Sequence, residues 1–153
     1  MDCLYVVPLW TLILYWLHRL AHTLPIVRDF HWDHHLVVAE DRLTGPEWKN
    51  LLLWNDTWRS TVDLWLTEVI PTLVIAAGTG CWWLAGAYYT WAASIQEAIE
   101  HNPQFGLFPI LPSGKWHLIH HLYPSENYGP FTVLWDYVFG TAHAHYQERL
   151  AQD

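Results

Sequence analysis

The chain has 153 residues, about one domain's worth, of which 52% are hydrophobic and only 14% are charged. Soluble domains carry about 25% charged residues, so this composition argues for a protein that lies in or against a membrane. The formal net charge of −8 argues against nucleic acid as a partner. Eleven histidines outnumber the seven lysines and arginines together, which makes histidine the residue type to explain.

The first apolar segment, residues 4–17, is short for a membrane crossing of about 20 residues. It can continue through Ala21 if His18 and His22 face the interior of the protein. No basic region precedes the segment and no small-residue cleavage site follows it, so we expect a retained span and not a signal peptide. Pro25 then ends the helix, and a second helix is predicted over residues 27–39.

Residues 44–47 have the features of a helix start, because proline is tolerated in the first turn and glutamate suits the positive end of the helix dipole. Residues 48–58 mix tryptophans and leucines with charged and amide side chains. This composition predicts a helix that lies at the membrane interface.

Two further apolar runs, residues 61–77 and 81–99, are joined by a Gly-Thr-Gly turn and predict a helical hairpin. The uncharged stretch of residues 69–96 exceeds the ~20 residues that a span needs, which disfavours the alternative of a soluble helical bundle. All lysines and arginines lie away from the turn, so the amino terminus and the turn are expected outside, with residues 22–60 and those after 101 in the cytoplasm. The sequence thus predicts an all-α integral membrane protein with about three spans and a histidine-lined di-metal site facing the cytoplasm of a bacterial inner membrane or the endoplasmic reticulum.

Nine histidines form four sets along the chain; in three of the sets the spacings i, i+3 or i+4 place the side chains on one helix face, and His101 stands alone. They are His18 and His22, then His31, His34 and His35, then His101, and finally His117, His120 and His121. Nine imidazoles are too many for one tetrahedral zinc ion and suit two metal ions with room for oxygen or water. An all-imidazole site suits zinc, copper, iron or nickel, and the spacing alone does not choose among them.

Several other residues carry weaker signals. Cys3 and Cys81 lack zinc-ribbon spacing and are expected to be reduced. Asp63 is expected near the interface, where solvent would explain its charge, whereas Glu68 lies deeper in the span and a role toward a lipid headgroup or a proton is a hypothesis. His143 and His145 are expected at the surface.

The ordered histidine boxes resemble those of the fatty acid hydroxylase and sterol desaturase superfamily, and the sterol desaturase branch most of all. The similarity begins at the HRLAH box of residues 18–22 and the HWDHH box of residues 31–35. It continues through His101 to the HLIHH box of residues 117–121 and the HHLY, NYG, LWD and FGT patterns that follow. It covers residues 17–141 within a single domain of residues 1–153, which is expected to be amino-terminally shortened relative to the family.

The resemblance implies that the nine histidines hold two non-haem iron ions. It further implies that the enzyme hydroxylates or desaturates a sterol, fatty acyl or isoprenoid lipid with O2, using electrons from a separate cytochrome b-type or ferredoxin-type carrier. Glu97, Asp33 and Asp136 are candidates for an additional ligand or for a partner that orients a ligand.

Three alternatives stay open at this level. One is a non-enzymatic membrane protein that binds metal or haem, another is a catalytically silent member of the family, and the third is a zinc hydrolase in which two metals activate water. Zinc could also replace iron in purified protein.

Overall fold

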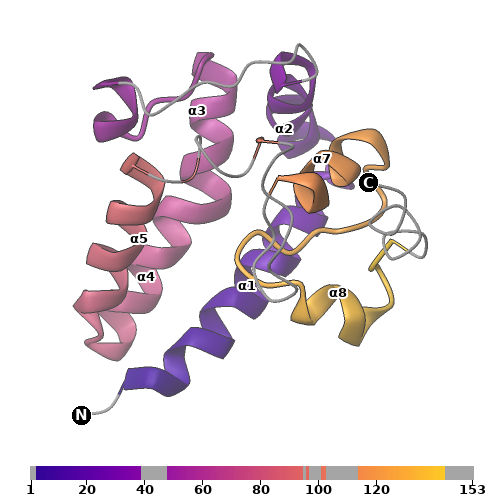
Figure 1. Cartoon of the computed structure of the whole chain (residues 1–153). Helices are drawn as coiled ribbons and strands as arrows, with labels where there is room; N and C mark the ends of the chain where they lie inside the picture. The colour runs from indigo at the N-terminus through magenta and orange to yellow at the C-terminus, as the bar shows by residue number, and fades with distance from the viewer. Residues whose placement is uncertain (1–2, 39–47, 95, 97–100, 103–113, 144–153) are drawn as a thin grey trace.

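The computed structural model describes residues 3–38, 48–94, 96, 101–102 and 114–143, and every regular element within these ranges is helical. The all-α prediction is therefore confirmed for the part of the chain that the structure describes. Figure 1 shows α1 running from the end of the molecule that holds the amino terminus toward the end where α2 and α7 lie.

The first apolar segment is one continuous helical stretch, in which the short helix η1 (Cys3–Tyr5) leads into α1 (Val6–Ala21). A second stretch runs without interruption through α3 (Trp58–Leu64), the π-helix η3 (Trp65–Val69) and α4 (Ile70–Thr79). Both stretches, Cys3–Ala21 and Trp58–Thr79, are long and apolar enough to cross a membrane. The described part of the third predicted span is α5 (Trp82–Ser94), with 13 residues. A count of three spans therefore remains a prediction.

The hairpin turn forms where the sequence predicts it. Gly80 ends α4 in the left-handed conformation with φ of 72°, which a residue without a Cβ adopts at little cost. The chain then reverses, and α5 packs along α4.

Cys3 and Cys81 form a disulfide bond, so the expectation that they are reduced was wrong. The sequence places them 78 residues apart, but the fold brings η1 and the hairpin turn to the same end of the molecule, where the two Cα atoms lie 6.0 Å apart. Cys81 is fully buried and belongs to the main apolar core. The bond ties the start of the first candidate span to the end of the second.

The interfacial segment differs from the prediction. Residues Trp48–Leu52 form the 3-10 helix η2, not a longer α-helix, and the chain leaves it through Leu53 with φ of 51°. A new helix starts only at Trp58, where the Thr57 hydroxyl caps α3 by accepting from the amide of Ser60. The predicted helix start at residues 44–47 lies outside the described residues.

The main core lies between α1 and the hairpin. It consists of Val6, Trp10, Leu14, Leu64, Val69, Cys81, Leu84, Tyr88 and Ala92. A buried hydrogen bond of 2.8 Å from the Trp10 indole to the Thr72 hydroxyl joins α1 to α4. This packing fixes α1 against the second span and so fixes the position of the histidines at its carboxyl end.

Candidate metal centre

Four segments bring the nine predicted histidines together. His18 and His22 come from the end of α1, the second box from α2 (Pro25–Val38), and the last box from α7 (Lys115–Leu122), while His101 approaches from the segment after α5. They form two groups, within each of which the candidate ligand nitrogens lie within 4.8 Å of one another. Group one is His18, His22, His31, His35 and His120, and group two is His34, His101, His117 and His121.

Each three-histidine box serves both groups. Residues four apart on a helix, such as His31 and His35, join the same group, whereas His34 turns to the other. The last box has the reverse arrangement, because His117 and His121 lie in group two and His120 in group one. The groups are neighbours, since the rings of His35 and His121 stack with their centroids 4.2 Å apart.

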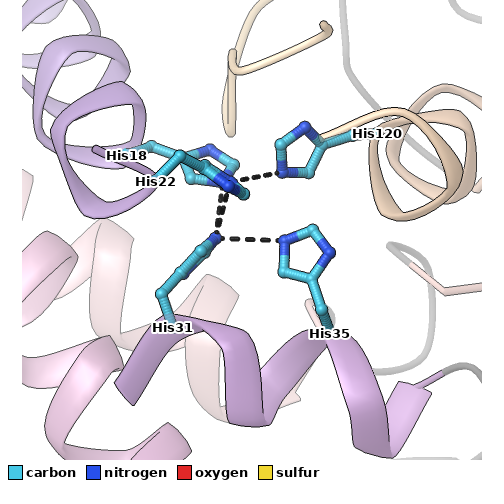
Figure 2. A group of neighbouring side chains, drawn as sticks. All are labelled: His18, His22, His31, His35 and His120. Atoms are coloured by element: carbon cyan, nitrogen blue, oxygen red, sulfur yellow. Dashed lines mark hydrogen bonds between the residues drawn. The ribbon is translucent and has the colours of Figure 1, made fainter. Parts of the chain in front are cut away.

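The rings of group one converge on a common point (Figure 2). The Nε2 atom of His31 lies 3.2 Å from that of His18, 2.9 Å from that of His22 and 3.2 Å from that of His35. The Nε2 atoms of His22 and His120 are 3.0 Å apart. Around a metal ion with bonds of about 2.1 Å, nitrogens at right angles lie about 3.0 Å apart, so the observed spacing fits a shared metal ion.

The opposite ring nitrogens explain why these Nε2 atoms need a cation. His18 donates from Nδ1 to the carbonyl oxygen of Tyr128 at 2.6 Å, and His31 donates from Nδ1 to the carboxylate of Asp63 at 2.8 Å. A neutral imidazole that donates from Nδ1 keeps an unprotonated Nε2, which is the atom that can bind a metal ion. Two facing lone pairs repel unless a positive ion lies between them.

His120 is oriented in the same way, by donation from Nδ1 to the carbonyl oxygen of Glu126 at 2.6 Å. Burial lowers the pKa of His34 to about 4 and that of His22 to about 3, with the charge of His31 as the next cause in both. The pKa values of His35, His120 and His121 are also lowered, again mainly by burial. These imidazoles are thus held neutral, which is the form that binds metal ions.

The comparison with protein families agrees with this geometry. The model of the fatty acid hydroxylase family matches residues 3–141, which is most of the chain and includes all nine histidines. The chain belongs to the fatty acid hydroxylase family. The resemblance in the sequence is thereby confirmed.

Curated relatives within this family are sterol enzymes. A delta(7)-sterol 5(6)-desaturase of Aspergillus fumigatus is 28% identical over 84% of this chain and 33% of its own length. A methylsterol monooxygenase of the same fungus is 31% identical over 83% of this chain and 42% of its own. A putative delta(7)-sterol-C5(6)-desaturase of Arabidopsis thaliana is 26% identical over 84% of this chain and 43% of its own length. The chain thus spans a third to less than half of the length of these relatives, which agree with the predicted sterol desaturase branch. No solved structure matches.

In this member of the fatty acid hydroxylase family, the loop after α7 helps to hold a histidine of group one in position. Asp136, fully buried in α8 (Leu134–Phe139), accepts hydrogen bonds from the amides of Tyr128 and Gly129 at 2.7 and 3.0 Å and from the Thr141 hydroxyl at 2.8 Å. Tyr128 in turn supplies the carbonyl that orients His18. Asp136 therefore acts through the loop backbone, and neither histidine group includes it.

The other two acidic candidates have different outcomes. Asp33 accepts a hydrogen bond from the hydroxyl of Thr57, so its carboxylate joins α2 to the start of α3, and neither histidine group includes it. Glu97 lies outside the described residues.

His143 is half-buried, pairs with the carboxylate of Glu126 and stacks on Tyr123, so the expected surface position was wrong in part. His145 is also outside the described residues.

Asp63 was expected near the interface, with solvent explaining its charge, and this expectation was wrong. It is only 6% exposed and holds His31 in place, so solvation does not explain its charge. The signal available in the sequence is an acidic residue in a largely apolar span, which is costly unless a partner satisfies it. The partner, on a different helix, is visible only in the fold.

Proposed function

We propose that this chain is an O2-dependent membrane enzyme that hydroxylates or desaturates a lipid at a di-iron centre held by its nine histidines. Group one supplies five nitrogens and group two supplies four. The observation that carries the proposal is the 3.2 Å approach of the Nε2 atoms of His18 and His31, whose Nδ1 atoms are bound by the carbonyl oxygen of Tyr128 and the carboxylate of Asp63. Such an arrangement calls for a cation between them.

Family membership favours iron over zinc, copper or nickel, all of which imidazole ligands suit. Bound iron would supply the O2 chemistry that breaks an unactivated C–H bond. Hydroxylation consumes one O2, two electrons and two protons and yields the alcohol and one water. Desaturation with the same inputs yields the alkene and two waters. The protein's part is to orient the ligands, bind the lipid and limit the access of water.

A lipid substrate and a separate one-electron carrier follow from the same reasoning. The relatives are named as sterol desaturases and a methylsterol monooxygenase, which makes a sterol or another lipid the substrate class to test first. The two candidate spans support a location within a membrane. A cytochrome b-type or ferredoxin-type carrier would bring the electrons that the reaction consumes.

The disulfide supports the predicted orientation of the centre. Disulfides persist in oxidising compartments, and Cys3 lies at the opposite end of α1 from His18 and His22. A 16-residue helix is about 24 Å long at ~1.5 Å per residue, close to the thickness of a bilayer core. With the disulfide on the periplasmic or lumenal side, the histidines face the cytoplasm.

The test is lipid oxidation by the full chain in detergent, loaded with ferrous iron and given a chemical reductant. Sterol, fatty acyl and isoprenoid lipids are screened by mass spectrometry, with and without O2. We expect a product 16 mass units heavier, or two lighter, that requires O2 and is lost in His35→Ala. Iron binding without any product would favour the catalytically silent alternative, and turnover without O2 would favour a hydrolase.

A further inference from the structure

An open groove lies between α2 and the start of α3, away from the metal centre. Its volume is about 500 Å³, within the range of ~300–1,000 Å³ that is usual for small-molecule sites. Its lining contains none of the nine histidines and consists of Arg28, Asp29, Trp32, Asp33, Leu36 and Arg59. The groove is therefore a separate feature of the molecule, and the proposed function gives it no role.

The two sides of α2 have different tasks. The groove residues of this helix recur at i, i+4 and i+8, so they share one face, whereas the histidines of the second box point to the metal groups. Asp33 accepts a hydrogen bond from the Thr57 hydroxyl, which holds the start of α3 beside the groove. The ring of Trp32 stacks on the imidazole of His35 with centroids 5.5 Å apart, and 43% of Trp32 is exposed. A ligand in the groove would thus brace the helix that carries the second box.

The position of the groove relative to the second candidate span puts it at the level of lipid headgroups. Arg59 is the second residue of that span, which begins at Trp58. Trp58 and Trp32 are both exposed, and tryptophan side chains gather where a membrane meets water. Figure 1 shows α2 and the start of α3 at the same end of the molecule. A bilayer around the two candidate spans would therefore bring phospholipid headgroups to this groove.

The charges of the lining select among such headgroups. The ion pairs within the described ranges are His31–Asp63, Lys49–Asp56 and His143–Glu126, and none of them involves a groove arginine. A guanidinium group presents donors that match phosphate oxygens, a carboxylate accepts from an ammonium group, and an exposed indole attracts a cation. Two arginines and two aspartates give the lining no net charge. This balance suits a ligand that carries both signs, because a purely anionic one would lie against Asp29 and Asp33.

We propose that this groove binds the headgroup of a zwitterionic phospholipid of the surrounding bilayer. Arg28 and Arg59 hold the phosphodiester, and Asp29 and Asp33 accept from the ammonium group. The apolar side chains of the lining contact the glycerol and the first acyl carbons. This lipid is distinct from the substrate, since it binds on the face of α2 that points away from the histidine groups. It joins α2 to α3 and so stabilises the folded protein.

The first test needs no variant. The full chain in detergent is titrated with phosphatidylethanolamine and with phosphatidylglycerol of identical acyl chains, and bound lipid is counted by native mass spectrometry. We expect about tenfold tighter binding of phosphatidylethanolamine, because the other lipid lacks the ammonium group and its hydrogen bond to a charged partner. Equal affinities, or tighter binding of phosphatidylglycerol, would indicate a merely basic surface and overturn the inference.

A competition experiment tests whether the ligand is a lipid. Soluble phosphoethanolamine should displace phosphatidylethanolamine only at a much higher concentration, because it lacks the parts that contact Trp32 and Leu36. Displacement at equal concentration would mean that the groove recognises a free phosphate compound, and the assignment to a bilayer lipid would be wrong.

The last test places the ammonium group in the groove. In Asp29→Asn the preference for phosphatidylethanolamine should fall about fivefold or more, since one charged acceptor is lost. Asp56→Asn is the matched control, because Asp56 pairs with Lys49 and neither residue lines the groove. An unchanged preference in Asp29→Asn, or an equal fall in the control, would overturn the inference. These tests measure bound lipid without turnover, so their failure would leave the proposed function as it stands.

Discussion

The carboxylate of Asp63 lies 2.8 Å from Nδ1 of His31, and the same imidazole presents Nε2 to three other histidines of group one. A carboxylate behind an imidazole fixes its tautomer and raises its basicity as a ligand. The second candidate span thus contributes to the centre although it carries no ligand.

Removing this carboxylate should weaken metal binding without removing a ligand. In Asp63→Ala we expect the affinity for one of the two metal ions to fall about 10–100-fold, which is typical for partners that orient ligands. Competition with a chelator of known affinity measures the change. Asp56→Asn, an exposed carboxylate that pairs with Lys49, is the matched control. Equal affinities in Asp63→Ala and wild type would show that the contact is only structural.

Gly129 is a position where the loop behind the centre cannot accept a side chain. A Cβ there would lie 2.2 Å from the carbonyl oxygen of Thr132 and 2.8 Å from Oδ2 of Asp136. We expect Gly129→Ala to lower the free energy of unfolding by about 1–3 kcal/mol or more, because the backbone must move. The same movement should lower the metal affinity of group one, because the neighbouring Tyr128 carbonyl orients His18.

The control for this change is Gly86→Ala, in the middle of α5, where nothing but the neighbouring residues and backbone of the helix itself lies within 4 Å of the added Cβ. Alanine is favoured over glycine in a helix by about 0.5–1 kcal/mol, so this variant should be as stable as the wild type or more so. Thermal unfolding in detergent compares the two. Similar losses in both variants would contradict the role assigned to the loop.

The disulfide between Cys3 and Cys81 should stabilise the fold without affecting the metal centre at the far end of α1. Loss of a native disulfide in small domains costs about 2–5 kcal/mol, and a comparable loss is expected for the Cys3→Ser, Cys81→Ser double variant. The metal content should stay at the wild-type level. A variant that unfolds at the wild-type temperature would show that the bond contributes little.

The predicted orientation can be tested with the same two cysteines. In spheroplasts of a bacterial expression host, a membrane-impermeant reductant followed by an impermeant maleimide should label Cys3 and Cys81, because the account places them on the periplasmic side. The double serine variant gives the background. Labelling that requires lysis of the spheroplasts would place the cysteines in the cytoplasm and reverse the orientation of the histidine groups.

Much of the fold follows from local patterns in the sequence. The apolar run that becomes α1, the break before Pro25 and the turn at Gly80 depend on residues close together in the chain, and each forms where it is predicted. The nine histidines that come together in the fold were likewise predicted from the sequence. Their division into groups of five and four was not, because it depends on how three helices face one another.

The missed features all depend on contacts between distant segments. The disulfide joins residues 78 positions apart, and Asp63 reaches a histidine 32 positions away. The carbonyl that orients His18 belongs to Tyr128, 110 residues later, and any residue type could supply it. Spacing along one helix carries no information about such partners.

The most direct test of the central claim is the metal content per chain, by elemental analysis of protein purified in detergent under reducing, iron-supplemented conditions. The account predicts about two irons in the wild type, about one in His35→Ala or in His121→Ala, and none when both are changed, because these residues belong to different groups. His143→Ala, outside both groups, should keep two. Intact, folded wild-type protein without bound metal, or a single ion lost in either variant, would contradict the two-metal centre.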